Sequence, residues 1–247
     1  MAARARAAGL AATEFEIRQG PAGDVLRSPV RARIRESIRR RRAAGVMLAS
    51  PCTSFTTARN RTRGPIRSRQ RPRGVLKYQW GEPLREVDKI ALKQGNRFLD
   101  VTISVLQDCN VTGTPACLEN PRNSYLWHDR KLRRVLKEGG VKYVTIDQCF
   151  YGQPWKKTTT LAFINCHDAD FGSLERAHCS GKHGWCEFNK DWHVQLSGDP
   201  RYAKVAPAKQ AQAFPPKLAQ AIVHTLLSRE RSHLSYVRFR EGLSSSA

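Results

Sequence analysis

The sequence predicts an α/β fold with a mainly parallel sheet and helices on both faces. Short apolar runs typical of buried strands alternate with longer segments whose apolar residues recur at helical spacing. Turn-forming residues, such as the pair Gly139-Gly140, separate these runs. Alternating strands and helices favour crossover connections and therefore parallel neighbours. A chain of 247 residues is also long enough to bury a full core.

Each element has its own signal in the chain. A Ser-Pro pair at 28–29 is typical of a helix start, and apolar residues then recur at helical spacing up to Arg42. Val46–Ser50 is a short apolar run suited to a buried strand. The longest amphipathic segment runs from Val87 to Asp108. We expect strands at 11–17, 46–50, 116–119, 141–146 and 158–165, and helices at 28–42, 87–108, 129–137 and 215–227.

The charge balance points to a polyanionic partner. The chain has 43 Lys and Arg against 21 Asp and Glu, a formal net charge of +22. Such an excess makes nucleic acid the first expected partner. No apolar run approaches the length of a membrane span, about 18 residues, and the first residues lack the apolar stretch of a secretory signal. We expect an intracellular protein, nuclear if its source is a eukaryote, with no membrane partner and an unknown oligomeric state.

Composition suggests a single α/β domain over residues 1–228. Within it, residues 51–80 form a basic stretch punctuated by Gly and Pro, which we expect to be a mobile loop. Residues 166–200 form an insert rich in Cys and His. Residues 229–247 end in Ser-Ser-Ser-Ala and are expected to be a flexible tail.

Chemistry-bearing side chains follow the predicted strands, where ligand sites form in parallel sheets. Cys52 comes directly after a Pro on the loop that leaves the strand at 46–50, and Glu119 ends the strand at 116–119. If these strands are neighbours, the thiol and the carboxyl share one crevice. Taken alone, Cys52 is also typical of a half-buried structural thiol, and Glu119 of a surface turn. Gln148 and Lys156 follow the third strand end.

These segments, in this order, resemble the cytosine-5 DNA methyltransferase family. Pro51–Thr56 is similar to the family's Pro-Cys-x-x-Phe-Ser loop, and Glu119–Pro121 to its Glu-Asn-Val. Gln212–Ala219 resembles its Asn-x-Val-Pro-Pro-x-x-Ala segment. The resemblance implies a Rossmann-like methyltransferase sheet, N-terminally truncated because the family's Gly-rich first motif is absent from the sequence.

The resemblance also assigns roles to residues of this chain. Cys52 would be the nucleophile that attacks carbon 6 of a flipped cytosine, and Glu119 would hydrogen-bond the ring. Glu16, Asp24 and Pro51 would contact the donor, S-adenosylmethionine. The nucleic acid, DNA in the family, would be held by basic and amide side chains: Arg59, Arg61, Arg63, Arg122, Gln148 and Lys156.

The Cys/His-rich insert offers a second kind of site. Cys179, His183, Cys186 and His193 are four soft or borderline metal ligands within a short segment, a pattern that could close around tetrahedral zinc. Reduced thiols and surface histidines explain the same residues without a metal.

Two other functional classes fit the sequence. One is a non-enzymatic basic nucleic-acid-binding protein, such as a mobile-element product, in which the zinc-knuckle-like cluster binds and Cys52 is idle. The other is a cysteine-dependent nucleobase-modifying enzyme that uses a different one-carbon donor.

Overall fold

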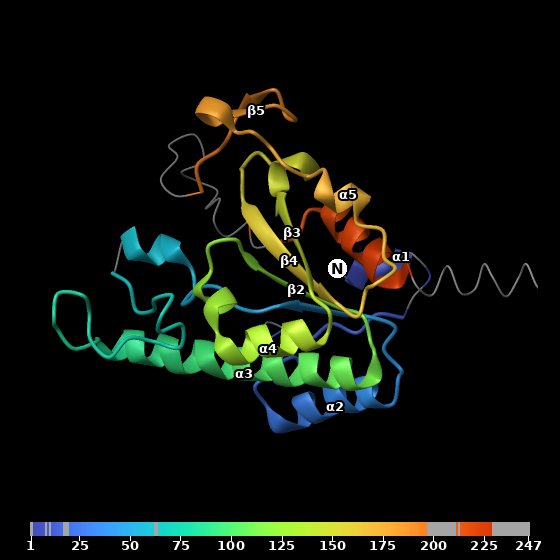
Figure 1. Cartoon of the computed structure of the whole chain (residues 1–247), viewed down its shortest axis with the longest axis horizontal. Coiled ribbons are helices and arrows are strands. Elements are labelled where there is room, and N and C mark those ends of the chain that lie inside the picture. Colours follow the sequence, from blue (N-terminus) through green and yellow to red (C-terminus); the bar gives the residue numbers. More distant parts are fainter. Residues whose placement is uncertain are drawn as a thin grey trace, which may run out of the picture. The chain divides into compact units, whose positions relative to one another are not determined.

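The computed structural model (Figure 1) describes residues 2–7, 9, 11–16, 20–61, 64–196, 211 and 213–228. The predicted tail at 229–247 lies outside the described residues, as does Arg63. No helix among the described residues is both long enough and apolar enough to cross a membrane. The chain divides into two compact units, the first formed by 1–12, 144–158 and 166–247, and the second by 13–143 and 159–165. The prediction of one domain stays a prediction.

The structure is a mixed α/β fold built on a four-stranded sheet. The strands are β1 (Val46–Ala49), β2 (Ala116–Pro121), β3 (Lys142–Asp147) and β4 (Thr158–Ile164), in the order β1-β2-β4-β3. β1 runs parallel to β2, but β4 runs antiparallel to β2. The sheet is therefore mixed, and the expected mainly parallel arrangement is not found. The segment 148–157 that joins β3 to β4 contains the short 3-10 helix Gln148–Tyr151, and it lacks the α-helix that usually forms a parallel crossover.

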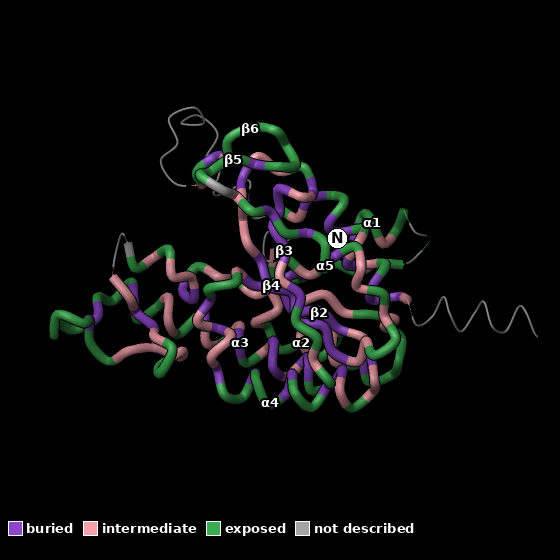
Figure 2. The backbone as a smooth tube through the Cα atoms, turned by 45° about the horizontal axis from the view of Figure 1, so that its top comes forward, coloured by how far each residue is buried: buried purple, intermediate pink, exposed green. Residues whose placement is uncertain are grey.

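Helices pack against the strands of the second unit. These are α2 (Ser28–Arg39), α3 (Glu86–Thr112) and α4 (Arg130–Glu138), and α3 lies between the other two (Figure 1). All three agree closely with the predicted helices, because each carries an apolar stripe that the core covers. The core includes Leu99, Leu106, Leu118 and Leu136, all fully buried. Figure 2 shows the buried stretches of β2 and β4.

Two helix ends have clear local causes. The Asp129 side chain accepts a hydrogen bond from the Leu132 amide and so caps the start of α4. Gly113 ends α3 with a φ of 69°, a left-handed conformation that glycine adopts at little cost. The Ser-Pro pair predicts Ser28 as the cap of α2, but Arg27 takes the capping position and Ser28 is already helical; the helix ends at Arg39, before the predicted Arg42.

The segment 11–16, expected to be part of a strand, has no regular secondary structure. It still packs closely on the following turn, since a Cβ added at Gly23 would lie 2.1 Å from the Glu16 carbonyl oxygen. The close approach of the two backbones leaves no room for a side chain at position 23, and the segment 11–16 is not part of a sheet.

The described part of the basic stretch at 51–80 makes packed contacts and ion pairs, while its predicted mobility stays a prediction. Ile66, Tyr78 and Leu84 form a small hydrophobic cluster of their own. Arg59 pairs with the fully buried Asp88, and Arg73 pairs with Asp129. These ion pairs could not be predicted from the sequence, because an arginine that pairs inside the protein and an arginine that faces water occur in the same kind of basic stretch.

The first unit contains α1 (Ala2–Ala7), α5 (Gly172–Glu175) and a helix at 216–228. The last confirms the helix predicted at 215–227, and its Leu218 and Ile222 are fully buried. A small hairpin, β5 (Trp185–Cys186) paired with β6 (Asp191–Trp192), also belongs to this unit.

Candidate functional site

Two parallel strands of the second unit bring the predicted nucleophile and carboxyl to the same edge of the sheet. In the register of β1 and β2, Ala49 lies opposite Glu119. Cys52 follows just beyond Ala49 on the loop that leaves β1. Because parallel strands end at the same edge, Cys52 and Glu119 belong to the same end of neighbouring strands. Glu119 is 7% exposed, and Cys52 is half-buried.

Two hydrogen bonds tie the loops after β1 and β2 together. The Asn120 side-chain amide donates to the Ser50 carbonyl oxygen at 2.9 Å, and the Tyr125 amide donates to the Phe55 carbonyl oxygen at 2.9 Å. These bonds join residues on both sides of Cys52 to the segment that begins at Glu119. The edge is therefore a connected structure and not two independent loops.

The loop that carries Cys52 folds as a compact turn. The amides of Phe55 and Thr56 both donate to the Cys52 carbonyl oxygen at 2.8 Å. Ser54 and Phe55 are buried beneath the turn. Burial of the loop's own side chains fixes the backbone at Cys52 and leaves its thiol partly exposed.

A buried arginine organises this turn from below. Arg67 has no exposed surface, and its guanidinium donates to the carbonyl oxygen and hydroxyl of Ser54, at 3.1 and 3.0 Å. The same group donates to the Pro72 carbonyl at 2.7 Å and the Asn96 side chain at 2.8 Å, and lies 3.8 Å from the centre of the Phe55 ring. Burial, followed by repulsion from Arg73, lowers the pKa of Arg67 to about 9, so it remains charged at neutral pH.

A glycine of α3 makes room for this arrangement. A Cβ added at Gly95 would lie 2.3 Å from the Ser54 hydroxyl and 2.7 Å from a guanidinium nitrogen of Arg67. Glycine inside a helix ordinarily costs about 1 kcal/mol relative to alanine. Here its lack of a side chain admits the arginine and the turn, which explains a glycine in the middle of a long helix.

The residues predicted to bind nucleic acid fall into three groups. Arg122 is exposed and follows the end of β2 closely. Arg59 is engaged with Asp88, and the Arg61 side chain and Arg63 lie outside the described residues. Gln148 is buried and accepts a hydrogen bond from the Trp155 indole, while the Lys156 ammonium donates to the Cys179 carbonyl. Among the side chains of this set that the structure describes, Arg122 is exposed and lies three residues after Glu119 in the chain.

Of the residues predicted to contact the methyl donor, Asp24 lines a hollow together with Gly20, Pro21 and Arg27, and neither Glu16 nor Pro51 is among its lining residues. Glu16 is exposed on a segment without strand structure. The Asp24 carboxylate accepts a hydrogen bond from the Leu26 amide at 2.9 Å, which is a local turn contact. Pro51 is exposed beside Cys52. The structure gives no support for a bound S-adenosylmethionine at these residues, and their assignment stays a prediction.

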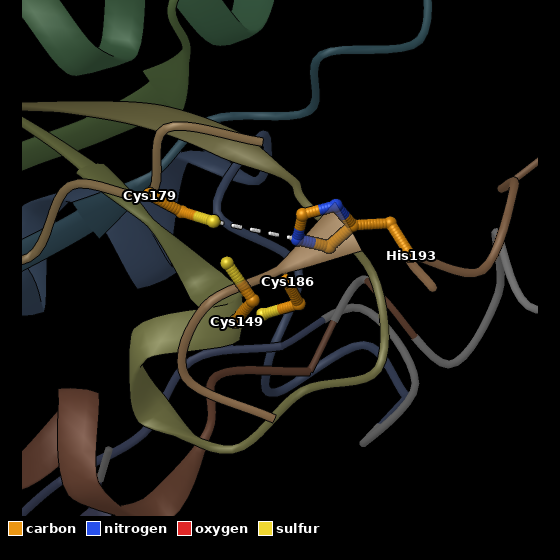
Figure 3. Close-up of side chains that lie close together, drawn as sticks. All are labelled: Cys149, Cys179, Cys186 and His193. Carbon is orange, nitrogen blue, oxygen red and sulfur yellow. Dashed lines mark hydrogen bonds between the residues drawn. The ribbon is translucent and has the colours of Figure 1, made fainter. Parts of the chain in front are cut away.

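Four side chains of the first unit form a group that could hold a metal ion. The Cys149, Cys179 and Cys186 sulfurs and a His193 ring nitrogen all lie within 4.8 Å of one another (Figure 3). The structure thus brings together three of the four predicted ligands. His183 is exposed and lies outside the group, and Cys149 takes its place. We call these four residues the Cys3His cluster.

The cluster is closely packed and largely shielded from water. All three cysteines are buried, and the Cys179 sulfur lies 3.6 Å from Nε2 of His193. Burial and the two neighbouring thiols raise the pKa of Cys149. Burial also lowers the pKa of His193, which favours the neutral imidazole.

Sequence reasoning missed two residues of these sites. Cys149 lies thirty residues before Cys179 in the numbering, so no short-range spacing links it to the insert. Its position directly after a predicted strand was the available signal. Arg67 gave no signal, because it is one of several arginines in a basic stretch.

The fold and these two sites define the class: a basic, mixed α/β protein with a thiol and a carboxyl at one sheet edge and a separate Cys3His cluster. Comparison with known proteins adds no name, since no family model, curated protein or solved structure matches the chain.

Proposed function

We propose that the chain is a cytosine-5 methyltransferase-like protein that acts on nucleic acid, with DNA as the expected substrate. The observation that supports this proposal is the parallel pairing of β1 and β2, which carries Cys52 and Glu119 to one edge of the sheet. On this proposal the four strands are part of a Rossmann-like methyltransferase sheet in which β4 runs against its neighbour β2.

The proposed chemistry begins with activation of the base. The Cys52 thiolate adds to carbon 6 of cytosine, forming a C–S bond, and the electron pair of the C5–C6 double bond moves into the ring. The Glu119 carboxyl donates a hydrogen bond to N3 and accepts one from the exocyclic amine, which stabilises the negative charge that develops. Carbon 5 is now an enamine carbon and attacks an electrophile. Loss of the C5 proton then expels the Cys52 thiolate and restores the ring.

The base has to leave a helix to reach this edge. A cytosine stacked in a duplex cannot bring carbon 6 to a half-buried thiol, so the nucleotide is flipped out or single-stranded. The net charge of +22 supplies the attraction for the phosphate backbone. Arg122, exposed next to the end of β2, is placed to contact a phosphate beside the flipped nucleotide.

The methyl donor is the part of this proposal that rests on the resemblance alone. S-adenosylmethionine supplies a methyl group at a sulfonium centre when bound. Because the structure gives no support for its binding, the activation chemistry above is built without it. Activation needs only Cys52, Glu119 and the base, and it can therefore be tested separately from methyl transfer.

The test is exchange of the C5 hydrogen with solvent. In the absence of a methyl donor, a proton from water can add to the enamine carbon, and loss of the original hydrogen completes the exchange. We expect the wild-type protein to release tritium into water from DNA labelled with tritium at cytosine C5. Cys52→Ser and Glu119→Gln should release at least about 100-fold less, in line with the loss of a nucleophile or an acid group. Cys166→Ser is the matched control, because Cys166 is also a half-buried cysteine and belongs to neither of the segments that carry Cys52 and Glu119.

Two outcomes separate the functional classes. Binding of labelled DNA without tritium release would refute the methyltransferase-like proposal and favour a non-enzymatic nucleic-acid-binding protein. Release that persists in Cys52→Ser would show that another group is the nucleophile.

A further inference from the structure

We propose that the Cys3His cluster is a structural zinc site, with Cys149, Cys179, Cys186 and His193 as its four ligands. Three thiolates and one imidazole are a donor set typical of closed, tetrahedral zinc sites. Sulfur and nitrogen ligands also disfavour the oxygen-preferring ions magnesium and calcium. A fourth protein ligand leaves no position for a reacting water, so the expected role is structural.

The geometry of the cluster is close to what zinc requires. With bonds of about 2.3 Å to sulfur and about 2.1 Å to nitrogen, the ligand atoms of a tetrahedral site lie about 3.5 to 3.8 Å apart. The Cys179 sulfur and Nε2 of His193 are already 3.6 Å apart. The largest separation in the group is below 4.8 Å, so closing around an ion needs a shift of about 1 Å at most.

Groups around the ligands hold them in place. The Asn189 amide donates to the Cys186 sulfur at 3.4 Å, a contact that stabilises a thiolate. The Asp147 carboxylate accepts a hydrogen bond from the Cys179 amide at 2.9 Å, and the Lys156 ammonium donates one to the Cys179 carbonyl oxygen. The backbone of Cys179 is thus fixed from both sides, as expected for a ligand oriented by a second layer of hydrogen bonds.

The hairpin that carries two of the ligands is short and is joined to the turn after β3 by a few contacts. The Asn189 side-chain amide donates to the Gln153 carbonyl oxygen at 2.6 Å, the Val194 amide donates to the Pro154 carbonyl oxygen at 2.8 Å, and the Phe188 ring lies 4.9 Å from the Phe150 ring. β5 and β6 have two residues each, and isolated two-stranded hairpins are marginally stable at best. Its large aromatic side chains do not form a core, since Trp185, Phe188 and Trp192 are 42%, 38% and 54% exposed. His183 and Lys190 also adopt left-handed backbone conformations that are costly for non-glycine residues. On this proposal, metal ligation adds a cross-link that strengthens these contacts.

The ion would also join parts of the chain that are far apart in sequence. Cys149 lies in the short 3-10 helix Gln148–Tyr151 directly after β3, whereas the other three ligands lie in the insert. A bound zinc therefore cross-links the turn after β3 to the hairpin. Three cysteines cannot pair completely as disulfides, and every cysteine of the cluster is a free thiol.

The test uses the full chain loaded with Zn²⁺ or Co²⁺. We expect one zinc per chain after dialysis, and for Co²⁺ the visible absorption and sulfur-to-metal charge-transfer bands of a tetrahedral thiolate site. Cys149→Ser should lower the affinity for Zn²⁺ at least about 100-fold, because it removes a direct ligand. His183→Ala is the matched control and should bind Zn²⁺ as tightly as the wild type.

A third variant guards against loss of binding through misfolding. His193→Cys keeps four soft ligands, so it should retain the ion and intensify the sulfur-to-cobalt absorption. Wild-type protein that retains no zinc, or a spectrum of octahedral cobalt, would overturn the proposal. So would full binding by Cys149→Ser together with lost binding by His183→Ala, because the ligand set would then be the one predicted from the sequence.

Discussion

Replacing Arg67 by methionine is expected to cost much of the stability of the second unit. The substitution keeps a long side chain but removes every donor that Arg67 directs at Ser54, Pro72 and Asn96. A buried acceptor left without a donor costs about 1–3 kcal/mol, so the loss of two or three predicts a destabilisation of roughly 3–5 kcal/mol. Whole domains are stable by only about 5–15 kcal/mol, so the effect should be large.

Urea unfolding followed by circular dichroism measures this loss. With an m value of about 2 kcal/mol/M, the midpoint should fall by about 1.5–2.5 M. Arg69→Met is the matched control, because Arg69 is exposed in the same segment and its replacement should change stability by less than about 0.5 kcal/mol. If both variants unfold at the same urea concentration, the guanidinium does not support the Cys52 turn and the reasoning is refuted.

Three other predictions follow from the second unit. Gly95→Ala should lower the free energy of unfolding by about 1–3 kcal/mol, because the added methyl group overpacks against Ser54 and Arg67 despite the better helix propensity of alanine. A thermal midpoint at or above that of the wild type would contradict this prediction. Burial, and after it the charge of Asp108, raises the pKa of Cys109 to about 12, so this thiol stays protonated at pH 8. Iodoacetamide at pH 8 should therefore label half-buried Cys52 and leave Cys109 unmodified, which peptide mass spectrometry measures. Arg122→Ala should reduce the slope of log affinity for DNA against log salt by about 1, whereas an unchanged slope would exclude a phosphate contact there.

Much of the fold could be predicted from local patterns. The helices α3 and α4 and the strands β1 to β4 follow from apolar periodicity, because each buries one stripe or a whole run. The direction of β4 could not be read in this way. A buried strand has the same apolar sequence whether its neighbour is parallel or antiparallel, and the choice depends on the connection before it.

The residues of the candidate sites divide in the same way, into those that local sequence predicts and those that depend on tertiary contacts. Cys52 and Glu119 could be placed at one edge because both directly follow apolar runs, and strand ends are local features. Arg67 and Cys149 depend on tertiary contacts, since one lies under a turn and the other beside a distant hairpin. The predicted strand at 11–17 failed for a related reason. Its alternating pattern has no neighbouring strand to pair with over residues 11–16.

The shared sheet edge can be tested most directly by cross-linking. Glu119→Cys introduces a thiol opposite Ala49 in the strand register, and a bifunctional thiol reagent about as long as a pyrimidine ring is wide should join it to Cys52. Glu138→Cys is the control. Glu138 is exposed at the end of α4, and the carbonyl oxygen of the next residue, Gly139, accepts a hydrogen bond from the Asn165 amide. Asn165 follows Ile164, which pairs with the first residue of β2, so position 138 lies near the opposite end of that strand. The account predicts peptides linked through position 119 and none through position 138. Cross-links to Cys52 from 138, or from neither position, would contradict it.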